Sequence, residues 1–124
     1  MVNKQDYINA INQNIDMVRG DNLAFNFQLS GLGSRGAYAA LLFTFAVAEH
    51  YDDDSILECT NNNGITLESY DGASDTATFS VFVAPNKTKT LDLARYYYDL
   101  QMKNNTNVVT LMRGRLTLVY DVAD

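Results

Sequence analysis

Few side chains in this sequence belong to the types that carry out covalent catalysis. There is one cysteine, Cys59, and one histidine, His50, so a nucleophile and its general base would have to be this pair. No residue that would orient the histidine and no oxyanion-hole motif accompanies them, and the P-loop, HExxH and GxSxG motifs do not occur. We therefore expect Cys59 to be a small core residue, and we expect the protein not to be an enzyme.

The acidic run Asp52-Asp53-Asp54 is the main candidate for a metal site, with Glu49 and Glu58 near it in the sequence. Carboxylate oxygens are ligands for Ca²⁺, but calcium loops alternate their ligands and usually contain a glycine. Consecutive side chains in extended backbone point to opposite sides, so three in a row rarely converge on one ion. A solvated loop is the favoured interpretation, a calcium site stays open as the alternative, and we expect no cofactor.

Three short motifs suggest recognition or modification. Arg19-Gly20-Asp21 matches the integrin-binding tripeptide, and Asn86-Lys87-Thr88 and Asn104-Asn105-Thr106 match glycosylation sequons. Glycine adopts positive φ and aspartate accepts backbone hydrogen bonds, so the tripeptide is better explained as a turn between two strands. The amino-terminal residues lack the layout of a signal peptide, so we expect neither sequon to be used.

The tyrosine run Tyr96-Tyr97-Tyr98 is the most informative cluster. In a strand, Tyr97 points to the opposite side from Tyr96 and Tyr98. One side has to enter the core, and we expect a packing like a tyrosine corner, with hydroxyl groups bonded to the backbone. Tyr97 is then a candidate for a protein interface, where tyrosine is enriched, or for a platform on which a sugar ring stacks.

Apolar spacing predicts the elements that would position these residues. Period-two alternation and turn residues predict about seven or eight short strands, which is typical of an all-β, antiparallel β-sandwich. A turn at 61–64 contains an Asn-Gly pair that favours type I′, and Pro85 ends one strand before a helical turn over 86–93. The predicted strands are residues 23–29, 38–49, 56–60, 65–70, 76–83, 94–102, 108–112 and 116–122, with a bend or bulge at 113–115. The last two are one strand or a pair of strands, and an alanine-rich helix is the competing interpretation of 38–49.

The amino-terminal residues follow a different pattern. Tyr7, Ile8, Ile11 and Ile15 recur at helical spacing, which predicts a short amphipathic helix or an arm that orders on a partner. We therefore divide the chain into an arm over residues 1–14 and a β-sandwich over residues 15–124. Tyr7, Ile8 and Ile11 in the arm, together with Tyr97, are the candidate interface residues.

Composition limits the classes of partner. The chain has 124 residues, 9 Lys+Arg and 15 Asp+Glu, and a formal net charge of −6. This length suits one domain. A negative charge disfavours nucleic acid, because binding to phosphates needs clustered lysine and arginine. No apolar run reaches about 18 residues, so we expect no membrane partner.

Several motifs, in their order along the chain, resemble those of small bacteriophage structural proteins. These are Arg19-Gly20-Asp21 before a strand, Ala84-Pro85 followed by Thr88 and Leu91, Tyr96-Tyr97-Tyr98-Asp99-Leu100-Gln101, Thr110-Leu111 followed by Gly114, and Asp121-Val122. The pattern is similar to the amino-terminal domain of phage baseplate upper proteins and covers about residues 15–124.

The resemblance implies an immunoglobulin-like β-sandwich in a virion, assembled in the host cytoplasm and used for docking rather than catalysis. The implied partners are other virion proteins, and the implied state is a homo-oligomer or a ring-associated copy. Baseplate upper proteins continue into a carboxy-terminal region that carries receptor-binding proteins. The present sequence stops at Asp124, before any such region, so a tail, collar or baseplate connector or adaptor is the expected role. A capsid decoration or head-fibre protein and a carbohydrate-binding β-sandwich module are the alternatives.

Overall fold

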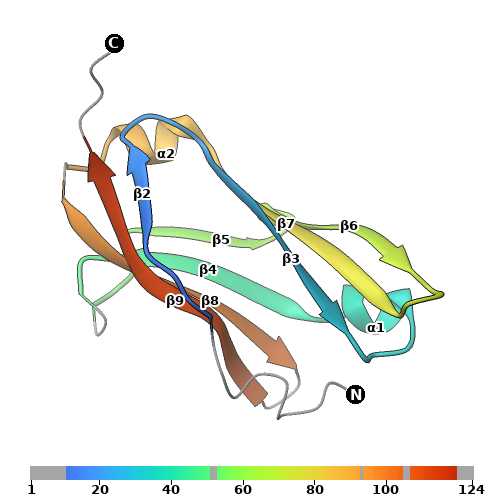
Figure 1. The fold of residues 1–124 in the computed structure, drawn as a ribbon. Coiled ribbons are helices and arrows are strands. Elements are labelled where there is room, and N and C mark those ends of the chain that lie inside the picture. The colour runs from blue at the N-terminus through green and yellow to red at the C-terminus, as the bar shows by residue number, and fades with distance from the viewer. Residues whose placement is uncertain (1–10, 51–52, 93, 105–106, 120–124) are drawn as a thin grey trace.

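Strands account for most of the chain in the computed structural model, which describes residues 11–50, 53–92, 94–104 and 107–119 (Figure 1). Two short helices interrupt them. The elements are β1 Ile11–Asn12, β2 Ile15–Val18, β3 Leu23–Ser30, α1 Arg35–Ala39, β4 Leu42–Ala48, β5 Leu57–Asn61, β6 Gly64–Asp71, β7 Thr76–Val83, α2 Pro85–Lys89, β8 Arg95–Asn104 and β9 Asn107–Val119.

The strands of the described residues form one sheet in the order β1-β9-β8-β4-β5-β6-β7-β3, with β2 also paired to β9. Most neighbours are antiparallel, but β1 and β2 run parallel to β9, and the short contact between β5 and β6 is also parallel. The all-β prediction is confirmed, whereas the sheet is mixed rather than antiparallel throughout.

The predicted turn at 61–64 is present, but it lacks the type I′ geometry, which needs positive φ at both Asn63 and Gly64, and it makes a corner rather than a long hairpin. Asn62 and Gly64 have φ angles of 61° and 102°, which asparagine and glycine tolerate. β5 and β6 share only two paired positions, Thr60 with Gly64 and Asn61 with Ile65. The chain therefore leaves the β9-β8-β4-β5 half of the sheet here and enters the β6-β7-β3 half.

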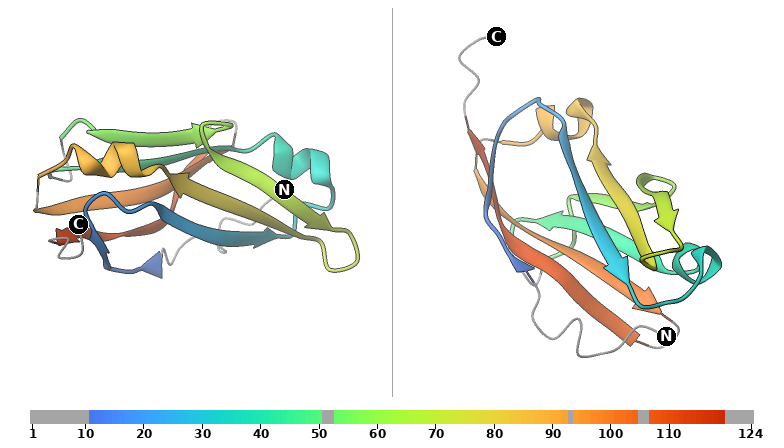
Figure 2. Two further views of the ribbon diagram at one scale, coloured as in Figure 1. Left: turned by 90° about the horizontal axis from the view of Figure 1, so that it is seen from above. Right: turned by 45° about the vertical axis from the view of Figure 1, so that its right-hand side comes forward.

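The two halves face each other (Figure 2), and the buried apolar side chains between them form one core. β3 and β4 are not neighbours in the sheet, yet Phe25 lies 5.7 Å from Phe45 and Phe27 lies 5.3 Å from Phe43 between ring centroids. Both pairs are edge-to-face, a favourable geometry for aromatic rings. The sheet thus folds back around its own inner face in a barrel-like way.

Period-two alternation correctly predicted which side chains enter this core. β3 alternates half-buried and exposed residues along its whole length, and the buried side of β8 carries Tyr96, Tyr98, Leu100 and Met102. β4 has apolar residues on both faces and lies between β8 and β5, as expected for an interior strand. The helical turn predicted over 86–93 is present as α2, but it starts at Pro85 itself and ends at Lys89.

Two local predictions are wrong. Tyr38 belongs to α1, not to the strand that follows, and Ser34 caps this helix by accepting the Ala37 backbone N–H. β9 continues through 113–115 as one paired strand, and the register shift lies instead opposite Leu100 and Gln101, between Met112 and Thr110.

The amphipathic helix predicted as one alternative for the arm is wrong for the arm residues that the structure describes. Ile11 and Ile15 lie in strands that pair with β9, opposite Met112 and Leu116. Within the described residues, strand pairing is therefore present from Ile11, four residues before the predicted start of the β-sandwich. Tyr7 and Ile8 lie outside the described residues, so their proposed interface role stays a prediction.

Candidate functional site

Charge is sorted from acidic to basic across the outer face of β5, β4, β8 and β9. The strand register places Glu58 beside Ala46, Ala46 beside Asp99, and Asp99 beside Arg113. These four residues form one row across four strands, which we call the charged row. An acidic side chain stands at its β5 edge and a basic one at its β9 edge.

A second outer row runs alongside. Ala48 pairs with Tyr97, and Tyr97 pairs with Arg115. Because the loop after β4 carries the exposed carboxylates of Glu49 and Asp53, the β5 side of this row is acidic as well, and its β9 side is basic. Between the two sides, the methyl groups of β4 lie next to the large side chains of β8.

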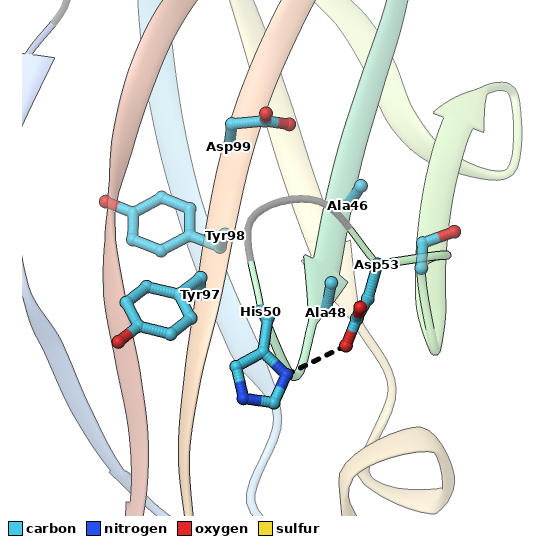
Figure 3. A pocket seen from close by; sticks show the side chains of 8 residues that line it. Ala46, Ala48, His50, Asp53, Tyr97, Tyr98 and Asp99 are labelled. Atoms are coloured by element: carbon cyan, nitrogen blue, oxygen red, sulfur yellow. Dashed lines mark hydrogen bonds and ion pairs between the residues drawn. The ribbon is translucent and has the colours of Figure 1, made fainter.

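This difference in side-chain size leaves a shallow pocket on the face (Figure 3). Figure 3 shows Ala46 and Ala48 on β4, Tyr97 and Asp99 on β8, and His50 and Asp53 at the loop. The pocket is lined by Ala46, Ala48, His50, Asp53, Ser55, Tyr97, Tyr98 and Asp99.

Asp99 is half-buried in this face. Desolvation raises the pKa of its carboxyl group, and the nearby Arg113 guanidinium partly opposes that rise. A half-buried carboxylate, an aromatic ring and an arginine can each make directional contacts, and tyrosine and arginine are enriched in protein interfaces.

The acidic loop brings three possible metal ligands together. Ligand atoms of Glu49, His50 and Asp53 lie within 4.8 Å of one another, and all three residues are exposed. His50 Nδ1 is 2.8 Å from Asp53 Oδ2. Asp54 is also exposed, and Asp52 lies outside the described residues. The residues that lie close together are thus Glu49, His50 and Asp53, and not the three successive aspartates. Calcium binding stays an alternative prediction.

Cys59 is a core residue, as predicted. Its side chain is fully buried, its thiol lies 3.6 Å from the Phe82 carbonyl oxygen, and burial raises its pKa despite the nearby Lys87. A catalytic thiol needs the opposite shift, because the thiolate is the nucleophile. His50 stands in an exposed loop, so the structure gives this pair no shared site.

The Arg19-Gly20-Asp21 turn is confirmed, and it is tied to α2. Gly20 has a φ of 93°, and its backbone N–H donates to the Thr88 hydroxyl oxygen at 3.2 Å. Thr88 lies 2.9 Å from the Asp21 carbonyl oxygen, to which it donates, and is 1% exposed. Thr88 is the third residue of the Asn86 sequon, and its buried hydroxyl holds the Arg19–Asp21 turn against α2.

The tyrosine prediction is also confirmed. Tyr96 donates its hydroxyl to the Asp92 carbonyl at 3.0 Å, four residues upstream, which is a tyrosine-corner contact. Tyr98 donates to the Gln13 carbonyl at 2.7 Å and so fastens the segment between β1 and β2 to β8. Tyr97 lies on the outer face, half-buried, as the alternation required.

Sequence reasoning missed Asp75. Its carboxylate accepts the backbone N–H groups of Gly31 and Gly33 and the hydroxyls of Tyr38 and Tyr70, at 2.9–3.2 Å. Desolvation raises the pKa of Asp75, but these hydrogen bonds outweigh it and leave the pKa below its usual value. The two glycines were visible as a loop, but nothing in the sequence indicated that residue 75 lies against them.

Comparison with known proteins does not extend this description. No family model matches the chain, and a search of curated proteins gives no match. Among the described residues, no helix has the length and apolar character needed to cross a bilayer.

Proposed function

We propose that this protein is a non-catalytic docking component of a bacteriophage particle, at the tail, collar or baseplate. The observation that carries the docking role is the outer face built around the charged row, Glu58–Ala46–Asp99–Arg113. It combines an aromatic side chain, a shallow pocket and sorted charges, features by which proteins select one partner over another.

The finer fold in this proposal is an immunoglobulin-like β-sandwich. Three features support it: one half orders its strands β2-β9-β8-β4-β5, the other orders them β3-β7-β6, and β2 runs parallel to the last strand. A further feature is the Tyr96–Asp92 corner at the start of β8, preceded by the helical turn α2. A tyrosine corner at this position is a hallmark of immunoglobulin domains.

The placement in a phage particle rests on the sequence resemblance. Two of its motifs, the Arg19-Gly20-Asp21 turn and the segment containing Thr88, meet through hydrogen bonds. Two others, the tyrosine segment and the Thr110–Gly114 segment, pair as neighbouring strands. Motifs that lie far apart in the sequence therefore belong to one folding unit, which supports treating them as a single pattern.

Counting copies of the protein per particle tests this proposal. Quantitative mass spectrometry of purified virions should give a small number divisible by three or six. A count in the hundreds would indicate a capsid decoration protein instead. Absence from the particle would contradict the virion assignment and favour the carbohydrate-binding alternative.

A further inference from the structure

We propose that the outer face of β5-β4-β8-β9 binds the same face of a second copy of this chain, about a twofold axis that runs parallel to the strands between β4 and β8. The inference rests on the docking function proposed above and names its partner. Homo-oligomers with closed twofold symmetry bury the same patch on both subunits, so the patch must be complementary to itself.

The charged row meets this requirement. A twofold axis parallel to the strands exchanges the two edges of the face and leaves each row opposite itself. Glu58 of one copy then faces Arg113 of the second copy, and Arg113 of the first faces Glu58 of the second. The neighbouring row behaves in the same way, because its acidic loop side comes to lie opposite Arg115.

The shapes of the two faces also fit each other about this axis. The axis places β8 of one copy over β4 of the other, so each Tyr97 stands opposite the small side chains Ala46 and Ala48. The shallow pocket in Figure 3 therefore receives a ring from the second copy, and its own ring enters the equivalent pocket. Tyrosine in a pocket at the centre of an interface is a frequent source of binding energy.

Other arrangements lack this complementarity. A twofold axis across the strands would place the acidic β5 edge against itself, and like charges opposed in an interface are costly. The outer face of the other half holds neutral side chains such as Asn26, Gln28 and Ser80, and its charged residues, Glu68 and Asp71, are both acidic. Two copies of that face would therefore bring no opposite charges together.

The size of the face predicts a weak dimer. Four strands of the observed lengths cover roughly 450–600 Å², from a strand spacing of ~4.8 Å and a rise of ~3.3 Å per residue. Stable interfaces bury about 800 Å² per partner, so we expect a dissociation constant in the micromolar range and a dimer that high salt weakens.

Complementary charge reversal tests the arrangement by sedimentation velocity from ~1 to ~500 μM. Glu58→Arg alone should weaken the dimer about tenfold or more, because it opposes two pairs of like charges, and Arg113→Glu alone should do the same. An equimolar mixture of the two variants should restore dimers, because each reversed residue then meets its opposite.

Glu68→Arg is the matched control, because Glu68 and Glu58 are both exposed strand glutamates that accept a serine hydroxyl. This control should leave the dimer intact. Arg113→Glu is checked for folding by circular dichroism, because it places a second carboxylate beside Asp99. Should that variant not fold, Ala48→Gln, which fills the pocket, takes its place and should weaken dimerisation as a single variant.

The proposal is overturned if the wild-type chain stays monomeric at every concentration, or if the mixture of reversed variants does not dimerise. It is also overturned if Glu68→Arg weakens the dimer as much as Glu58→Arg. A monomeric protein that is still present in virions would overturn the twofold interface alone. A charge-swapped dimer of a protein absent from virions would overturn the phage assignment alone.

Discussion

The Thr88 hydroxyl joins segments that lie more than sixty residues apart in the sequence. It accepts the Gly20 N–H and donates to the Asp21 carbonyl from a position almost without solvent. Thr88→Val preserves shape but leaves both backbone groups without this partner. We expect the free energy of unfolding, measured in urea, to fall by about 1–3 kcal/mol.

Two variants serve as controls for this loss. Thr88→Ser keeps the hydroxyl and should retain most of the stability. Thr90→Val makes the same chemical change at an exposed position and should change stability by less than about 0.5 kcal/mol. An equal loss for both valine variants would show that the hydroxyl at position 88 is not what matters.

Asp75 makes the stability of the folded protein depend on pH in the acidic range. Its folded pKa lies below the unfolded value, so its carboxylate stabilises the native state above the unfolded pKa. This contribution is lost as the pH falls through the folded pKa. We expect the melting temperature of the wild type to fall between about pH 5 and pH 2, and Asp75→Asn to start lower and to change less across that window.

Asp54→Asn is the control for this pH profile, because it removes a carboxylate from an exposed loop. Its melting curve should follow the wild-type profile. If Asp75→Asn also follows the wild type at every pH, the hydrogen bonds from Tyr38, Tyr70 and the two glycines do not stabilise the ionised carboxylate.

At the scale of elements, the attachment of the amino-terminal strands to β9 depends on one glycine. A Cβ atom at position 114 would overlap the Gln13 carbonyl oxygen and approach the Tyr98 ring. Gly114→Ala should therefore push the segment between β1 and β2 away and cost about 1–3 kcal/mol. Hydrogen exchange should speed up at the Gln13 and Arg19 amides, which bond to β9 carbonyls.

Gly36→Ala is the comparison for that variant. Gly36 lies in α1 with open space around it and no positive φ, so alanine should be neutral or stabilise by about 0.4–1 kcal/mol. Unchanged exchange at Gln13 in Gly114→Ala would mean that the chain accommodates a methyl group without moving these strands.

Strand faces were predictable because the side-chain period of a strand is two, and each strand carries that pattern in its own residues. The helical interpretation of Ile11 and Ile15 was wrong for the same reason: the two residues are four apart, a spacing that suits one face of a helix and one face of a strand equally well. Only the pairing partner decides between them, and that partner, β9, lies about a hundred residues away.

The candidate site shows the same limit. Tyr97 was predictable from the run of three tyrosines, because alternation alone puts it on the outer side. The charged row was not, because Glu58, Ala46, Asp99 and Arg113 come from four strands and meet only through the register between them. A single sequence specifies the faces of its strands but leaves their lateral order open.

At the scale of the whole molecule, Cys59 reports on unfolding. It is the one cysteine of the chain and is fully buried at the corner between the two halves of the sheet. Thiol labelling should be at least about 1,000-fold slower in buffer than in concentrated urea, since it requires the core to open. The opening free energy from labelling rates should equal the unfolding free energy from urea.

Rapid labelling in buffer would contradict this expectation, because it would mean that the β5–β6 corner opens while the rest of the fold stays intact. Ser55→Cys in a Cys59→Ala background is the positive control. Its thiol would stand in the partly exposed loop before β5 and should react at once.

The parallel pairing of β2 with β9 has a mechanical consequence. Tension applied between the two ends of the chain would draw β2 toward its start and β9 toward its end, in opposite directions along a shared axis. The backbone hydrogen bonds between them would then carry the load together in shear, instead of opening one after another as in an unzipped hairpin. A pulling experiment on the single molecule should therefore find one high rupture force at this pair of strands, a property suited to a component that holds under strain.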